Sequence, residues 1–343
     1  MLCAWRVAAP LRCDSLAVRR AMQDYPFIRE LRSPITEDQL RPLDPRCHVV
    51  QFNAPLTDGD FAKVARFLEA DLSIPLRIYG HHGNSPDLAF LRYFPFLKGF
   101  QADVFEIQSW DGLRYLPDSL EFLALGATRR KLSLAPIARF SRLTDLFLEG
   151  HSNDIAVLSG FPHLTYLTLR STTLRDLAML RPLRNLRSLA LKLGGTNRLA
   201  LLRALSGIRY LELLMVRGLA DVSVVADLPE LRYLFLQDLK NVRSLPSFRS
   251  LRELRRCDIE NLKGLSDITP IAEAPNLEEL ILVNMGHLSV ESLACFRAHP
   301  TLKAASIGLG SKRRNEQAAT LLGLGAVTEI KPVRKYVESR VDS

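Results

Sequence analysis

One spacing of leucines recurs along most of this chain and constrains what it can fold into. Leu164, Leu167 and Leu169 form one copy of the pattern L-x-x-L-x-L, and copies begin at residues 120, 143, 164, 186, 208, 231, 251 and 277, in steps of 20 to 26 residues. The last two leucines alternate with other residues, as a half-buried strand requires. A single copy cannot bury three leucines, whereas strands stacked in parallel bury them in a continuous core.

The segments that lead from one copy to the next follow a second rule. Apolar residues stand nine, six and three positions before Leu231, as Val222, Val225 and Leu228, and other copies repeat this spacing. A strict spacing of three suits a 3₁₀ turn or a very short helix. Proline stands two residues before several copies, where it ends the return segment without removing a strand hydrogen bond. These prolines are Pro162, Pro229, Pro275 and Pro300.

Less regular copies extend the pattern in both directions. Cys47, Ser73 and Leu97 begin earlier copies, and Leu302 begins the last clear one. The longer steps leave room for a true helix over residues 60–70 and for a helix over residues 290–298. In the copy that begins at Leu251, Arg256 stands where a core residue is expected, which predicts a bulge or a shifted register.

The repeats divide the chain into three stretches of one solenoid, with no linker and no second domain. Residues 1–46 are expected to form an N-terminal cap with a helix start at Thr36, residues 47–310 about 11–12 repeats, and residues 311–343 a C-terminal cap and tail. A cap covers the apolar end of a terminal repeat. In the last stretch we expect a closing helix over 311–322, an edge strand over 326–330 and a charged tail over 331–343 that frays.

The L-x-x-L-x-L units of about 22 residues resemble the leucine-rich-repeat superfamily, in its short-repeat class of phosphatase-regulator and internalin-type proteins. The resemblance covers nearly the whole chain. It implies an α/β fold, a solenoid with a curved parallel sheet on the concave side and short helices or 3₁₀ turns on the convex side. It also implies a binding scaffold, since the superfamily consists mainly of such scaffolds.

The chain departs from the family at one position of the repeat. The family usually places asparagine, or sometimes cysteine or threonine, three residues after the last strand leucine, where it hydrogen-bonds neighbouring loops. We therefore expect less regular backbone pairing in the turns after Val216 and Leu239 than in related repeats. The residues at this position are Thr128, His151, Thr172, Gly194, Val216, Leu239 and Met285.

Charge and cysteine content indicate the compartment and bear on the partner. The formal charge of +9 is moderate and its arginines are dispersed, which favours general solubility over a nucleic-acid footprint. The five cysteines include no C-x-x-C pair, so we expect a reducing, cytoplasmic location. The first ten residues fit a secretory signal poorly, no stretch is long and apolar enough for a membrane span, and either Met1 or Met22 is compatible with the true start.

The candidate site lies on the concave side, where strand residues between the leucines point outward. Aromatic residues form a column there, and arginines run beside them; both types are enriched at interface hot spots. Two interpretations remain open, a protein-binding face and rings that merely cover a sheet. The predicted partner-binding residues are Phe147, Tyr166, Arg170, Lys192, Arg209, Tyr210, Glu212, Arg232, Tyr233, Phe235 and Arg255.

Other candidate sites are weaker. The pair His81-His82 has no third metal ligand nearby, and Cys295 with His299 has a spacing that suits packing. The short basic run Lys312-Arg313-Arg314 is typical of a solvated helix start. We therefore predict no catalytic residue, no cofactor and no metal. The preferred hypothesis is a monomeric, non-enzymatic scaffold that binds a protein partner of unknown identity, with a polyanion or nucleic-acid binder as the alternative and an unrecognised enzyme third.

Overall fold

The computed structural model describes residues 27–80, 88–328 and 333–338. The chain divides into two compact units, Met1–Leu164 and Thr165–Ser343, and each is described by itself. The described residues contain thirteen strands, and within each unit the strands pair in parallel in sequence order. In the first unit they are β1 Ile28–Glu30, β2 Val49–Phe52, β3 Leu76–Tyr79, β4 Gly99–Asp103, β5 Phe122–Leu125 and β6 Asp145–Glu149. In the second unit they are β7 Tyr166–Arg170, β8 Ser188–Lys192, β9 Tyr210–Leu214, β10 Tyr233–Gln237, β11 Arg256–Glu260, β12 Glu279–Val283 and β13 Ala304–Ile307.

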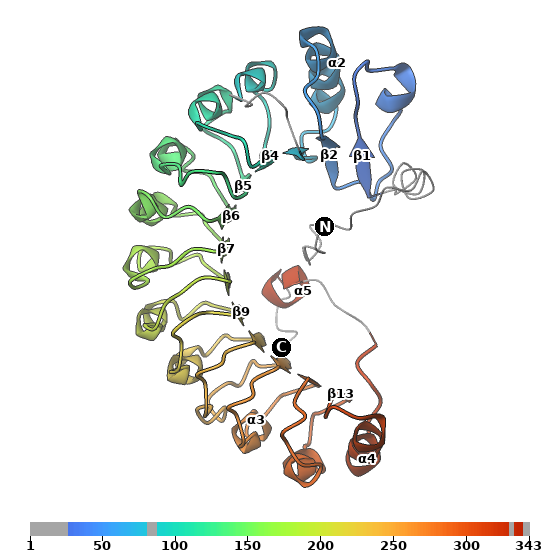
Figure 1. The fold of residues 1–343 in the computed structure, drawn as a ribbon, viewed down its shortest axis with the longest axis vertical. Coiled ribbons are helices and arrows are strands. Elements are labelled where there is room, and N and C mark those ends of the chain that lie inside the picture. Colours follow the sequence, from blue (N-terminus) through green and yellow to red (C-terminus); the bar gives the residue numbers. More distant parts are fainter. Residues whose placement is uncertain (1–26, 81–87, 329–332, 339–343) are drawn as a thin grey trace. The chain divides into compact units, whose positions relative to one another are not determined.

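The strands form where the leucine spacing predicts them. In β7 the side chains of Leu167 and Leu169 are buried, and they pair in register with Leu189 and Leu191 of β8. The first leucine of each copy, such as Leu164, is also buried, at the turn into the strand. Each unit therefore buries leucines between its strands and its return segments, whose ribbons run on opposite sides of each repeat (Figure 1). We call the opposite, concave side of each sheet the strand face.

The return segments are mostly 3₁₀ helices, as the spacing of three predicts. In η8 the predicted residues Val222, Val225 and Leu228 are all buried against the strands. The 3₁₀ helices are η1 Glu37–Leu40, η2 Ala89–Tyr93, η3 Asp111–Tyr115, η4 Ala135–Arg139, η5 Ile155–Gly160, η6 Ala178–Leu180, η7 Ala200–Ala204, η8 Ser223–Asp227 and η9 Glu291–Phe296. The helix expected over 290–298 is the 3₁₀ helix η9.

Four described segments are α-helices. The expected helix α2, Asp58–Glu69, begins at Thr57, whose hydroxyl accepts a hydrogen bond from the Asp60 amide. The expected closing helix α4, Lys312–Leu322, begins at Ser311 and ends at Gly323 in the left-handed conformation. The other two are α3 Thr269–Ala272 and α5 Val333–Glu338. The prediction that residues 331–343 fray is wrong for α5.

The copy expected to be irregular has one of its two predicted features, a shifted register, and the shift is three residues. Its core positions are Leu254, Cys257 and Ile259, and β11 pairs with β10 residue for residue without a bulge. The copy therefore begins at 254, which is 23 residues after 231 and 23 before 277. Leu251 belongs to the return segment. Arg256 reaches the strand face because it precedes the first core position of the strand.

The two ends of the chain differ from expectation. The predicted N-terminal cap contains β1, whose Ile28 pairs with Val49 of β2. The helix expected from Thr36 is the single 3₁₀ turn η1. In place of the edge strand over 326–330, the described residues 326–328 carry none, and only Gly325 forms an isolated bridge, with Ala304. Residues 329 and 330 lie outside the described part.

The turns at Val216 and Leu239 carry main-chain hydrogen bonds between neighbouring repeats. Two residues after the last core leucine, Met215 and Asp238 adopt the left-handed conformation, and their amides donate to Gln237 O and Glu260 O at 2.9 and 3.0 Å. Val216 and Leu239, at the family's asparagine position, are buried and pack in the core. Main-chain hydrogen bonds and apolar packing therefore replace the asparagine side chain in these turns.

Candidate interaction surface

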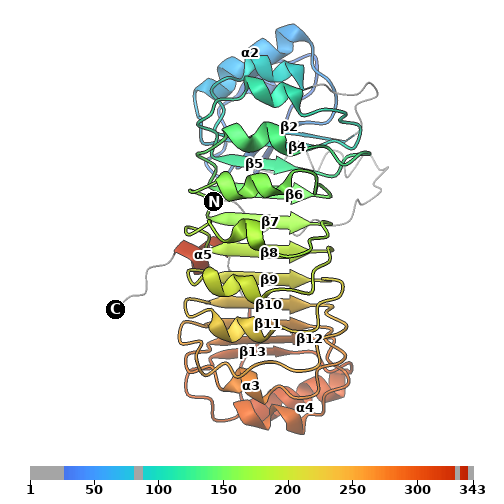
Figure 2. The same ribbon diagram turned by 90° about the vertical axis from the view of Figure 1, so that its left-hand side faces the viewer.

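The predicted site residues fall into both units. Phe147 lies in β6 of the first unit, and the other ten belong to the second unit. There the structure brings six of them together on the strand face: Tyr166, Arg209, Tyr210, Arg232, Tyr233 and Phe235. Helix α5 lies on top of them (Figures 1 and 2). This contact between the strand face and residues about a hundred positions further along the chain was not foreseen from the sequence.

The centre of the contact is aromatic. Tyr210 and Tyr233 occupy the same position in paired strands, and their ring centroids are 5.0 Å apart in an edge-on arrangement. Tyr336 of α5 places its ring 4.9 Å from that of Tyr233, and Val337 packs beside it. All four side chains are less than 10% exposed. The column predicted to be an open binding surface is therefore covered in this structure.

Two arginines of the same face hold the end of α5. Nη1 of Arg209 donates to the main-chain carbonyl of Val337 at 2.8 Å, and Nη1 of Arg232 donates to that of Tyr336 at 3.3 Å. The last carbonyls of a helix have no partner within it and carry the negative end of its dipole. Burial, with repulsion from Arg209, lowers the pKa of Arg232, but a guanidinium stays charged in proteins.

A buried ionic cluster lies beside the rings, on the next two strands. Arg256 donates from Nε and Nη2 to the two carboxylate oxygens of Asp258, each at 3.0 Å, and its Nη1 is 3.2 Å from Glu279. The Tyr233 hydroxyl donates to Asp258 at 2.7 Å, and the Tyr336 hydroxyl donates to Glu279 at 3.2 Å. Burial raises the pKa of Asp258, although Arg256 opposes the shift. Burial also raises the pKa of Tyr233, with the Asp258 charge adding to it, so its hydroxyl stays a donor.

Sequence reasoning missed Arg256, Asp258 and Glu279 as site residues. The register assigned to the copy at Leu251 placed Arg256 among core positions. A copy that begins at Leu254 lies 23 residues from each of its neighbours, at Leu231 and Leu277. This equal spacing was the signal that places Arg256 and Asp258 on the strand face.

The flanks of the contact are polar. The Tyr166 hydroxyl donates to Glu338 of α5 at 2.7 Å, and the guanidinium of Arg334 lies 4.9 Å from the Tyr166 ring centroid. On the receiving sheet, Lys192 and Glu212 form an ion pair at 2.7 Å, and the Tyr210 hydroxyl also donates to Glu212. Arg255 continues the column of Arg209 and Arg232, one repeat further, and donates to Asn276 O. Arg170 ends β7 at its carboxyl end.

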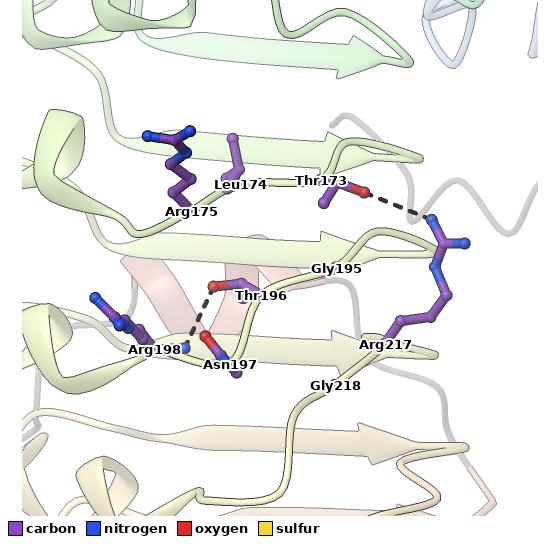
Figure 3. Close-up of a pocket in the computed structure, with 9 residues that line it drawn as sticks. All are labelled: Thr173, Leu174, Arg175, Gly195, Thr196, Asn197, Arg198, Arg217 and Gly218. Carbon is purple, nitrogen blue, oxygen red and sulfur yellow. Dashed lines mark hydrogen bonds between the residues drawn. The ribbon is translucent and has the colours of Figure 1, made fainter.

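A depression of about 700 Å³ opens along the loops that lead from β7, β8 and β9 into the return segments (Figure 3). Arg217 donates to the Thr173 hydroxyl across it at 3.5 Å, and the Arg198 amide donates to the Thr196 hydroxyl. The lining offers arginine and hydroxyl groups but no histidine, cysteine or acid, so it lacks a base or an activated nucleophile. Its residues are Thr173, Leu174, Arg175, Gly195, Thr196, Asn197, Arg198, Arg217 and Gly218.

The weaker sequence candidates form no chemical site in the described residues. Cys295 donates to Ser292 O, His299 contacts Ala274 O, and burial raises the pKa of the Cys295 thiol, which disfavours a reactive thiolate. Within the described ranges, three or more potential metal-ligating side chains gather nowhere. His81 and His82 lie outside those ranges. None of the described helices is both long and apolar enough to span a bilayer.

Comparison with known proteins gives a likeness in structure only. No family profile and no curated protein matches the sequence. An internalin, InlF, from Listeria monocytogenes is 20% identical, with 77% of this chain and 83% of that chain covered and a TM-score of 0.50. Internalin C2 of the same organism is 22% identical over 60% and 79%, with a TM-score of 0.39. At these identities the likeness concerns the fold alone. With its parallel strands, buried L-x-x-L-x-L leucines and 3₁₀ return segments, the chain has the fold of a leucine-rich-repeat solenoid.

Proposed function

We propose that the protein is a non-enzymatic interaction scaffold that binds a protein partner on the strand face of its second unit. One observation carries this proposal: a peptide helix, α5, already lies on that face, held by aromatic rings and by arginines that bind main-chain carbonyls. Main-chain carbonyls and apolar side chains are groups that every protein partner offers. The surface is therefore suited to polypeptide.

The distribution of charge supports a protein over a polyanion. Arg256 is paired with Asp258 and Glu279, Lys192 is paired with Glu212, and Arg209 is paired with Glu230 at 3.1 Å. A nucleic-acid site gains affinity by neutralising phosphates with cations, which requires a cationic surface. On this face, carboxylates already neutralise much of the positive charge.

Photo-cross-linking from the strand face tests the proposal. A benzophenone amino acid replaces Phe235, which is partly buried on the strand face, or Arg249, which is exposed on the return side. In cells that express the full chain, we expect position 235 to capture a defined protein and position 249 to capture none in common with it. Capture of one and the same protein from 249 but not from 235 would place the binding surface elsewhere.

A reducing location and a monomeric state belong to the same proposal. Cys47 and Cys257 are buried in the cores of different units, and burial raises the pKa of both thiols, which suits thiols that stay reduced. A thiol titration under denaturing conditions, made after alkylation of the intact cells, tests the redox state. Light scattering of the purified chain tests the monomer, for which we expect a mass near 38.6 kDa.

A further inference from the structure

We infer that α5 is a built-in competitor that occupies a preformed socket for a short partner helix, one whose last turn carries a tyrosine followed by an aliphatic residue. The helix socket consists of Tyr166, Arg209, Tyr210, Arg232, Tyr233 and Glu279. The inference rests on the proposed function in one respect, since it names the kind of partner segment that the strand face takes.

The helix socket recognises three features of the helix that it binds. The rings of Tyr210 and Tyr233 receive the Tyr336 ring and the Val337 side chain. Glu279 accepts the hydroxyl of Tyr336, which distinguishes tyrosine from phenylalanine. Arg209 and Arg232 bind the carbonyls of Val337 and Tyr336, which are free only at the carboxyl end of a helix. The occupant is therefore selected by a side-chain pair and by its place in the last helical turn.

The socket keeps its own hydrogen bonds when α5 is absent. The Tyr210 hydroxyl bonds to Glu212, the Tyr233 hydroxyl bonds to Asp258, and Arg256 holds Asp258 and Glu279. Arg209 also keeps its ion pair with Glu230. None of these partners belongs to α5. When the helix departs, every buried charge in this network therefore keeps its partner. An open, receptive state is thus compatible with the second unit as it is folded.

The helix α5 is suited to leave. It has six residues, and isolated helices shorter than about 12 residues are marginal in water, so its helical form depends on docking. Ten residues, 323–332, separate it from α4. A tether of that length keeps α5 at an effective concentration on the order of millimolar, so it fills the socket even with a weak intrinsic affinity. A partner helix binds by outcompeting it.

The test measures binding of a free copy of the occupant to the full-length chain. The probe is a fluorescent synthetic peptide with the sequence of residues 329–343, followed by fluorescence anisotropy. The open variant carries Tyr336→Ala and Val337→Ala, and the matched control carries Lys335→Ala, because Lys335 lies on the exposed side of α5. Relieving competition of this kind should tighten binding of the peptide to the open variant by about tenfold or more over both the wild type and the control.

Two further binding measurements test how the socket recognises the peptide. Adding Arg209→Ala and Arg232→Ala to the open variant should weaken peptide binding about a hundredfold or more, and a peptide with phenylalanine at the position of Tyr336 should bind several-fold more weakly. Equal affinity of wild type and open variant for the peptide, or indifference to the two arginines, overturns the inference. Circular dichroism confirms that each variant is folded.

The photo-cross-link from position 235 separates failure of this inference from failure of the proposed function. If the open variant ignores the peptide but still captures a partner, the competitor role is wrong and the scaffold proposal stands. If the peptide binds as described and the open variant captures more of the partner than the wild type, both stand. If the peptide binds but position 235 captures no partner in the open variant, the scaffold proposal fails and α5 is only an intramolecular clasp.

Discussion

Leu167 and Leu189 lie side by side in β7 and β8, and both are fully within the core of the second unit. Leu211 and Leu234 continue the same row in β9 and β10. Because side chains alternate between the two faces of a strand, a shift by one residue would move every member of the row onto the strand face. Each leucine therefore helps to hold the register of its neighbours.

We predict that Leu167→Asp unfolds the repeats around it. The aspartate carboxylate would stand among stacked leucines with no cation in reach, whereas even loss of the side chain in Leu167→Ala costs about 2–5 kcal/mol. Thermal melting followed by circular dichroism measures the effect. The control is Thr168→Asp, whose side chain points to the strand face one residue away. A Leu167→Asp melt within a degree or two of the wild type would contradict the register.

Among the residues at the family's asparagine position, His151 is the one that has a ring in its side chain. It is buried, and its Nε2 donates to Gly126 O of the preceding repeat at 3.0 Å. Burial lowers the pKa of His151 from its ordinary value near 6.5. The folded chain therefore binds fewer protons at this site than the unfolded chain, and stability is lost as the pH falls through about 6.5.

We predict that His151→Asn removes this pH dependence. The asparagine amide also donates to a carbonyl but does not titrate. Between pH 7.5 and pH 5.5, the melting temperature of the first unit should fall further in the wild type than in the variant. Calorimetric melts at the two pH values provide the measurement, and parallel falls for both proteins would show that His151 does not couple folding to pH.

At the scale of single elements, α5 is where the sequence is least informative. Six residues are too few to show a helical period in the sequence. Four of the six are charged or tyrosine, a composition that is typical of a solvated tail. Its helical form comes from contacts made far away in the sequence, with Arg209, Arg232 and Tyr233. The leucine repeats behave differently, because each copy carries its own spacing and meets a neighbour only about 22 residues away.

We predict that Arg209→Ala with Arg232→Ala releases α5 without unfolding the sheet. The substitution removes two hydrogen bonds from charged donors to α5 carbonyls, each worth about 1.5–3 kcal/mol. Hydrogen exchange read by mass spectrometry should show faster exchange in peptides that cover residues 333–338. Peptides covering β9 and β10 should keep their protection. Unchanged exchange in α5 would mean that its rings alone hold it.

At the scale of the whole chain, the repeat sequence predicts most of the fold and part of the site. Leucine positions, return turns, α2 and α4 follow from local spacing and capping. The aromatic and arginine columns at Tyr210, Tyr233, Arg209 and Arg232 follow from strand alternation. Their burial under α5, the register of β11 and strand β1 do not follow, because each depends on pairing between segments whose own pattern is weak or, at Arg256, misleading.

The last prediction concerns how stability spreads along the second unit. Each strand of a solenoid pairs only with its neighbours, so stability is approximately a sum of terms for single repeats and for contacts between neighbours. Leu234→Ala in β10 leaves a cavity among Leu211, Cys257 and Leu236, with a cost of about 2–5 kcal/mol. Hydrogen exchange should therefore accelerate most in β9, β10 and β11, less in β8 and β12, and least in β13.

The control is Gln237→Ala, a partly exposed position of the same strand, which should leave the profile unchanged. A uniform acceleration over β7 to β13 would instead mean that the second unit unfolds as one cooperative block, and a core change anywhere in it would then release α5 as well.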